Sequence, residues 1–283
     1  MAAPPPRSPP PKPPPAAPAA KPAPTRSNGG GARAPALPLL YTRLEPLSRE
    51  RHAALRLRRP DDFAFARTAG VVPLTLTEFA AAAQYYPIVF LQSAPTKQPM
   101  PVAILGSRPQ ENQYVDAEGR WRPGHYVPAY LRRFPFITGD DVKPGQAVVF
   151  VDVASDKLSP TDGRALFSKG EPTEVAKLAV ELCQRYHQAA ALTERFAAAL
   201  AAAGVLADRV VEAKDQTGAK LTWRGMKAVD QEKLTKVDGK EFLAWRDRNW
   251  LAPIYLHQFS LHHFGAIAAS SLAAQSMAAA GKK

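Results

Sequence analysis

Proline density at the start of the chain is the feature that most restricts how this sequence folds. Fourteen of the 29 prolines lie within residues 1–38, in runs such as 4–6 and 9–11. Proline fixes φ and carries no amide proton, and the alanines between the prolines bury too little apolar area to offset the entropy of ordering the backbone. We therefore predict an intrinsically disordered, proline-rich basic arm over residues 1–38, followed by a single domain over residues 39–283.

The arm is expected to be an extended polyproline II spacer with a hinge. At about 3.1 Å per residue, residues 4–24 reach roughly 60 Å, and the glycines at 29–31 form a flexible joint. Arg7, Pro10 and Pro13 have the spacing of a ligand for a proline-binding groove. A passive spacer is nevertheless the favoured interpretation, because proline-dense segments match that spacing by chance.

Charge and cysteine content restrict the class of protein only broadly. The formal net charge is +12, and the arm supplies five of the positive side chains, which leaves +7 for the domain. This balance permits attraction to nucleic acid, anionic lipid or an acidic protein without defining a partner. The single cysteine, Cys183, cannot form an internal disulfide, so nothing requires an oxidising compartment.

Targeting signals are not visible in the sequence. The N-terminus lacks the apolar core of a signal peptide. Residues 249–281 are uncharged, but they contain three histidines and much alanine, which favours a soluble helix over a transmembrane one. We therefore predict a cytoplasmic protein without a transmembrane segment.

Patterning in the first half of the domain predicts an antiparallel meander with short helices. Thr75 and Glu78 have the spacing of a capping box, which predicts the start of a short helix. Further expected elements are strands at 88–92 and 102–106, a hairpin joining 113–115 to 120–121 through a turn, a short helix at 127–134, and a strand at 147–153.

The second half is expected to contain a long helix, a β-hairpin and C-terminal helices, so that the fold class is α+β. The long helix covers residues 173–203, and Gly204 ends it. Its predicted buried stripe consists of Val175, Leu178, Leu182, Ala189, Leu192, Phe196 and Leu200. The later elements are a hairpin of 209–214 and 219–224 with its turn at 215–218, a further strand at 225–229, and helices from 231, from 239 and over 253–279.

Motifs for catalysis or metal binding are not found, so we predict no catalytic residue, no metal and no cofactor. His257, His262 and His263 point in different directions on a helix of 3.6 residues per turn, which disfavours a common metal. Cys183 precedes His187 by four residues, yet a buried small side chain is the favoured interpretation. The sequence also lacks a phosphate-binding glycine loop and a nucleophile elbow.

Basic residues bunched near the start of the domain raise the hypothesis of nucleic-acid binding. They are Arg49, Arg51, Arg56, Arg58 and Arg59, and a second basic pair, Arg132 and Arg133, lies between aromatic residues. Basic and aromatic side chains together can track phosphates and stack bases. Leu55 and Leu57 alternate with the arginines, which fits a solvated edge segment better than a binding site.

Several strings of residues occur in the order and spacing of one family. They include Tyr86-Pro-Ile-Val-Phe90, Val102-Ala-Ile-Leu-Gly106, Tyr114-Val-Asp-Ala117, Arg132-Arg-Phe-Pro-Phe136, Asp230-Gln-Glu-Lys-Leu234 and Ile254-Tyr-Leu-His257. Over about residues 40–265 the chain resembles the bacterial SapC family. The family takes its name from a gene in a surface-layer protein locus, and its members generally lack an established biochemical activity. The resemblance implies work at the cell envelope or in uptake and carries over no catalytic residue.

Five polar residues within or near the matching strings have no local structural reason to be polar, and we take them as candidates for ligand binding: Glu78, Arg132, Arg133, His257 and Ser260. The leading hypothesis is a non-enzymatic interaction protein of the surface layer or envelope that binds a protein partner. The alternatives are an enzyme or small-ligand-binding protein with a pocket near Arg132, Arg133 and His257, and a nucleic-acid-binding protein. The ligand and the oligomeric state are left open.

Overall fold

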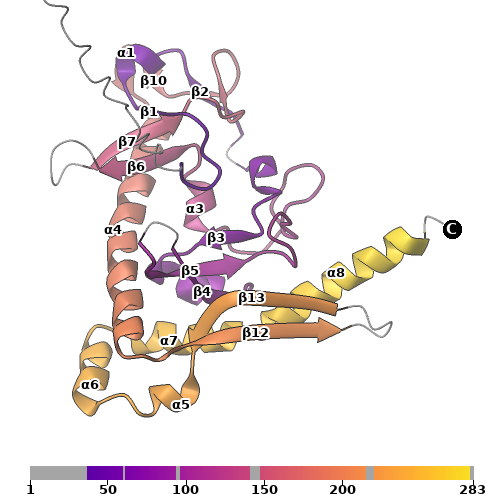
Figure 1. The fold of residues 1–283 in the computed structure, drawn as a ribbon. Coiled ribbons are helices and arrows are strands. Elements are labelled where there is room, and N and C mark those ends of the chain that lie inside the picture. Colours follow the sequence, from indigo (N-terminus) through magenta and orange to yellow (C-terminus); the bar gives the residue numbers. More distant parts are fainter. Residues whose placement is uncertain (1–36, 60, 94–95, 141–146, 215–219, 281–283) are drawn as a thin grey trace, which may run out of the picture. The chain divides into compact units, whose positions relative to one another are not determined.

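The computed structural model describes residues 37–59, 61–93, 96–140, 147–214 and 220–280. Residues Leu37–Lys283 form one compact unit. Almost all of the predicted arm, and the predicted turn at 215–218, lie outside the described residues. Helices and antiparallel strands are both abundant (Figure 1), which confirms the α+β class.

A five-stranded antiparallel sheet forms the centre of this unit. Its order is β12-β13-β4-β5-β3. The strands are β3 (Val71–Pro73), β4 (Ile88–Gln92), β5 (Pro99–Ile104), β12 (Leu206–Lys214) and β13 (Lys220–Val229). The predicted hairpin is confirmed, but residues 225–229 are not a further strand. They continue β13, because the pairing with β12 extends to Leu206 opposite Val229 across a bulge after Arg209.

The strand β5 begins three residues earlier than its sequence pattern predicts. Pro99 and Pro101 lack amide protons and therefore obscured the strand. They are accommodated because β3 pairs only with Val102–Ile104, so the first half of β5 has no strand neighbour on that side. A cavity opens beside this unpaired margin of the sheet.

A three-stranded antiparallel sheet lies at one end of the unit, in the order β1-β7-β6. Its members are β1 (Leu44–Pro46), β6 (Phe136–Asp140) and β7 (Ala147–Asp152), so the strand predicted at 147–153 is confirmed. Beside it are two-residue strands in two small sheets: β2 (Arg56–Leu57), β8 (Leu158–Ser159), β9 (Arg164–Ala165), β10 (Phe167–Ser168) and β11 (Glu171–Pro172).

The predicted meander is only partly correct. The strands β4 and β5 pair as expected, but the segments 113–115 and 120–121 form no regular hairpin. They meet in a single bridge between Val115 and Trp121. Asp116 stabilises the turn between them, because its carboxylate accepts hydrogen bonds from the Glu118 and Arg120 amides. These bonds substitute for the backbone hydrogen bonds of a longer hairpin.

Short helices connect the sheets. They are α1 (Arg49–His52), the 3-10 helices η1 (Ala64–Ala66) and η2 (Leu76–Glu78), α2 (Phe79–Ala82), α3 (Ala129–Arg132) and α5 (Gln231–Leu234). The predicted capping box is confirmed, because the Thr75 and Glu78 side chains bond to each other's backbone amides. The helix predicted at 127–134 is shorter than expected and begins after Pro128.

The long helix α4 (Glu174–Ala202) confirms the predicted helix within a residue at each end. It runs from the three-stranded sheet past β5 towards α7 (Figure 1). The predicted stripe is wrong at two positions, because Leu178 is 62% and Leu192 is 42% exposed. Phe196 and Leu200 of the stripe are buried as predicted. The other buried side chains of α4 are Ala176, Cys183, Thr193 and Ala197.

The C-terminal segment contains α6 (Gly239–Asp247), α7 (Leu251–Ser260) and α8 (His263–Ala280). The single helix predicted at 253–279 is therefore wrong, because the chain breaks after Ser260. The Ser260 hydroxyl donates to the His257 carbonyl at 2.6 Å, and the Leu261 amide turns to the Gln258 carbonyl instead. Among the described residues, no helix combines the length and the apolar character needed to cross a membrane.

Three clusters of buried side chains form the core. The largest joins α4, α6 and α7 to one face of the five-stranded sheet and contains Trp245, Tyr86 and Phe196. A second lies between the same sheet and α8. The third packs the three-stranded sheet on the first half of α4. The helix α4 therefore contributes to both the first and the third cluster.

Candidate functional site

Two of the predicted site residues, Glu78 and Arg132, belong to one hydrogen-bond network at α3. The buried Glu78 carboxylate accepts from the Thr75 amide and hydroxyl, both at 2.8 Å, and from the Tyr126 hydroxyl and Ala129 amide at 3.0 and 2.6 Å. Arg132 is exposed and donates to the Tyr126 hydroxyl oxygen at 3.0 Å. Burial, and then the Glu78 charge, raises the pKa of Tyr126. The carboxylate thus pins η2 to the first turn of α3.

Arg133 follows Arg132 but points the opposite way, into the protein. The side chain is only 6% exposed, and its guanidinium lies over the rings of Tyr130 and Tyr186, 4.5 and 3.9 Å from their centroids. Neighbouring positions on a helix differ by about 100°, which explains why one arginine faces solvent and the next faces α4.

His257 and Ser260 lie on the buried face of α7 and bond to the start of β4. The His257 Nδ1 atom donates to the Ile88 carbonyl at 2.7 Å, and its Nε2 atom accepts from the Val229 amide at 3.0 Å. The Ser260 hydroxyl oxygen accepts from the Ile88 amide at 2.9 Å. Burial lowers the pKa of His257 to about 4, against a weaker opposite effect of its bond to Ile88, so the ring is neutral at pH 7.

The five predicted residues do not form one site. Glu78, Arg132 and Arg133 gather around α3, whereas His257 and Ser260 join α7 to the five-stranded sheet, and the two groups share no hydrogen-bond partner. None of the five lines the cavity between α4 and the five-stranded sheet. Thr75, which bonds to Glu78, and Tyr186, which packs on Arg133, do line it.

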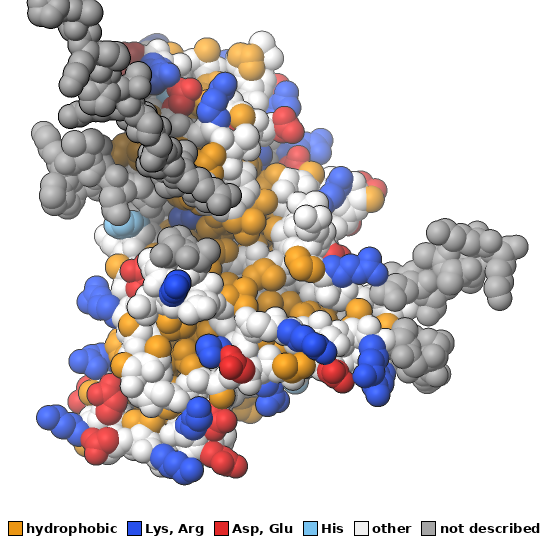
Figure 2. Space-filling model, viewed as in Figure 1, with side chains coloured by type: hydrophobic (Ala, Val, Ile, Leu, Met, Phe, Trp, Pro, Cys, Tyr) orange, Lys and Arg blue, Asp and Glu red, His pale blue; other side chains and the backbone are white. Residues whose placement is uncertain are grey.

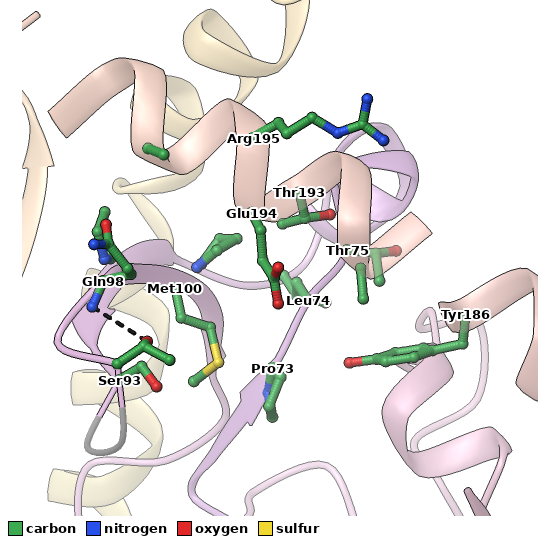
Figure 3. A pocket seen from close by; sticks show the side chains of 15 residues that line it. Pro73, Leu74, Thr75, Ser93, Gln98, Met100, Tyr186, Thr193, Glu194 and Arg195 are labelled. Atoms are coloured by element: carbon green, nitrogen blue, oxygen red, sulfur yellow. Dashed lines mark hydrogen bonds between the residues drawn. The ribbon is translucent and has the colours of Figure 1, made fainter. Parts of the chain in front are cut away.

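A cavity of about 410 Å³ lies between α4 and the margin of the five-stranded sheet (Figure 3). One wall is α4 between Tyr186 and Ala198, and the other is the end of β3, the loop after β4 and the first half of β5. Apolar side chains supply most of the lining: Pro73, Leu74, Pro99, Met100, Pro101, Tyr186, Ala190 and Ala198. Figure 2 shows hydrophobic side chains gathered in the middle of this face, with charged ones around α5 and α6.

Seven of the fifteen lining residues are polar, and the hydroxyls of two of them, Thr75 and Thr193, are engaged within the walls. The Thr193 hydroxyl accepts from the Leu76 amide at 2.7 Å and donates to the Ala189 carbonyl at 2.6 Å. Glu194 points into the cavity beside Met100, whereas Arg195 points away from it (Figure 3). The site is therefore an apolar hollow with one carboxylate, a composition suited to holding a ligand rather than to acid–base chemistry between paired groups.

Other reactive side chains are not arranged for catalysis or metal binding. Cys183 is fully buried, which raises the pKa of its thiol to about 12 and confirms the interpretation of a buried small side chain. His262 stacks on His263 with 3.9 Å between ring centroids, and His263 bonds to the Ala83 carbonyl. Across the part of the chain that the structure describes, no three histidine, cysteine or acidic side chains lie together as metal ligands would.

The basic segment near the start of the domain is largely paired with carboxylates. Three of its five arginines form ion pairs, Arg49 with Glu50, Arg51 with Glu45 and Arg58 with Asp162. These contacts reduce the positive charge that the segment can offer to phosphates.

The residues of the cavity were not among the sequence predictions. The only local signal was the Pro99-Met100-Pro101 string, whose prolines leave part of a strand without amide donors. No sequence pattern singled out Tyr186 or linked it to residues near position 100.

The fold and the site together define an α+β domain with a half-open, mainly apolar cavity beside its longest helix. The chain belongs to the SapC family, whose model matches residues 47–267. This match confirms the resemblance read from the sequence strings. No curated protein and no solved structure matches the chain.

Proposed function

We propose that this SapC-family protein is a non-enzymatic binding protein that holds a small, largely apolar ligand between α4 and the margin of its five-stranded sheet. The observation that carries the proposal is the cavity itself. Its volume of about 410 Å³ falls in the range of small-molecule sites, and its walls are mainly apolar, as such sites commonly are.

The hydrogen bonds of the two wall threonines support binding over catalysis. The Thr75 hydroxyl donates to the Glu78 carboxylate, and the Thr193 hydroxyl accepts from the Leu76 amide in η2 and donates to the Ala189 carbonyl in α4. Both hydroxyls are therefore already engaged within the protein. A preformed apolar hollow of this kind gains affinity from burying the apolar surface of a ligand, at roughly 25 cal/mol per Å².

A cavity-filling substitution tests the proposal. Ala190 lines the cavity on α4, whereas the next residue, Ala191, is exposed and does not. We expect the full chain to bind decanol with a stoichiometry of one, Ala190→Phe to weaken binding by about tenfold or more, and Ala191→Phe to bind like the unchanged protein, all by titration calorimetry. Equal binding by the Ala190→Phe variant, or no binding by the unchanged protein, contradicts the proposal.

A protein partner at the cell envelope is the second proposed role. Family membership supports the link to the surface layer, and two aromatic side chains one turn apart on α7 favour a protein contact. Phe259 is 74% and Tyr255 is 43% exposed, and exposed aromatic residues are enriched where proteins bind each other. We expect envelope material crosslinked to the protein in cells to be lost on Phe259→Ser. Retention of the same crosslinks by that variant would contradict this role.

A further inference from the structure

Arg133 is a buried cation without a counter-charge in contact. Its Nε atom is buried and has no hydrogen-bond partner in the protein. Arg133 takes part in none of the ion pairs formed by the side chains that the structure describes. An isolated buried charge is costly, so a protein that keeps one normally pairs it with another group.

The side chains around Arg133 cannot supply that charge. They are Tyr41, Tyr130, Tyr186 and Cys183, and burial raises the pKa of every one of them, with Arg133 acting in the opposite direction. All four are therefore uncharged at neutral pH. Glu78 is close enough to act on Tyr186, but its two oxygens already accept hydrogen bonds from Thr75, Tyr126 and Ala129 and form no ion pair with Arg133.

Tyr186 connects this cation to the cavity. One face of its ring lies 3.9 Å from the centre of the Arg133 guanidinium, and the same residue lines the cavity. In Figure 3 the Tyr186 hydroxyl points toward the cavity from one end. The unpaired cation thus lies directly behind the residue that closes that end of the hollow.

We propose that the ligand is an amphipathic acid whose apolar body fills the cavity between α4 and β5, and that its carboxylate reaches past the Tyr186 ring to bind Arg133, which does not itself line the cavity. This inference rests on the proposed function and adds the chemical class of the ligand. A guanidinium offers a planar fork of donors that matches a carboxylate, and the Nε donor of this fork has no partner in the protein.

Glu194 fixes the direction in which such an acid lies. Its carboxylate points into the cavity eight residues after Tyr186, which is about 12 Å along the helix. A negative head group is repelled from the Glu194 end and attracted to the Arg133 end. The apolar chain of the ligand then extends past Met100 toward Glu194.

Decanoate and decanol test the inference, because they share an apolar chain and differ in the acid group. We expect the full chain to bind decanoate about tenfold or more tightly than decanol at neutral pH, as a charge-assisted hydrogen bond implies. In Arg133→Met this preference should vanish while decanol binding stays within about twofold. Arg133→Gln, which keeps donors without charge, serves as a second variant.

The outcomes separate the two proposals. Equal binding of decanoate and decanol by the unchanged protein overturns the role of Arg133 and leaves the apolar site standing. Binding of neither compound overturns the proposed function itself. A preference for decanoate that persists in both variants also overturns the inference. Unchanged decanol binding by the variants supplies the check on a merely structural role, because Arg133 also packs on the rings of Tyr130 and Tyr186 and Tm alone does not separate the two roles.

Discussion

Buried polar side chains in this protein serve backbone groups that the sheets and helices leave unpaired. His257 bridges the Ile88 carbonyl and the Val229 amide where β13 turns away from β4, beyond their pair Lys227 and Phe90. Asp152 likewise accepts from the amides before β1. Leaving such groups unpaired in the interior costs about 1–3 kcal/mol each. The sequence analysis singled out His257 as a polar residue without a local structural reason, but its partner in β4 is 169 residues away and invisible to local patterns.

Acid should weaken the fold through His257. The pKa of His257 is lowered to about 4 in the folded state by burial, against about 6.5 in the unfolded chain. The unfolded state therefore binds the extra proton between these values, and the free energy of unfolding falls as pH drops from about 6.5 to 4, by up to about 3 kcal/mol. We expect His257→Gln to remove this part of the pH dependence, measured by urea unfolding across that interval.

A histidine in the break between α7 and α8 provides the control for that experiment. His262 is exposed, so His262→Gln should change the dependence far less than His257→Gln. His263, whose pKa is also lowered by burial, contributes a remaining slope of the same sign. An unchanged acid dependence in His257→Gln would contradict the assignment.

Helix ends follow from local residues, whereas helix faces do not. The limits of α4 were predicted within one residue because Thr173 and Gly204 flank it. Its buried face was misassigned because the helix packs on the three-stranded sheet in its first half and on η2 and β5 in its second. Leu178 lies on a face that no element covers. A single buried stripe would require α4 to pack against one element along its whole length, but α4 packs against several.

Gly204 should be required at the end of α4, whereas Gly239 at the start of α6 should be replaceable. Its φ is +68°, a left-handed conformation that costs a residue with a Cβ roughly 1 kcal/mol, although the space around it is open. Gly239 also has open space but lies at the start of α6 with ordinary φ. We expect Gly204→Ala to destabilise the protein by about 1 kcal/mol and Gly239→Ala to stabilise it by about 0.5 kcal/mol in chemical unfolding. The same sign for both variants would contradict this account.

At the scale of the whole molecule, the cavity arises from segments far apart in the chain. Residues 73–75, 93, 96–101 and 186–198 meet only because α4 crosses the sheet beside the unpaired half of β5. The sequence was sufficient to predict the fold class and the family, since these depend on local patterns and on ordered strings. The cavity depends on the packing of α4 against β5, and no string of residues encodes that crossing locally.

Because α4 crosses from one core cluster to another, we expect the described unit to unfold cooperatively. The helix α4 contributes Cys183 to the third cluster and Phe196 to the first, so the clusters should unfold together if residues 39–283 are the single domain that the sequence predicts. All four tryptophans lie in the first and second clusters, none in the third. Leu166 is fully buried in the third cluster. Leu166→Ala should remove about 2–5 kcal/mol and lower Tm by roughly 5–15 °C, and tryptophan fluorescence should report that shift although the third cluster contains no tryptophan.

The exposed leucine on α4 supplies the matched control. Leu178→Ala should leave Tm within about 1 °C, because little apolar surface is lost on a side chain that is 62% exposed. In Leu166→Ala, the fluorescence and circular dichroism transitions should coincide, as they do when one cooperative unit unfolds. A fluorescence midpoint that stays in place while part of the helical signal melts early would instead divide the protein at α4 into two domains.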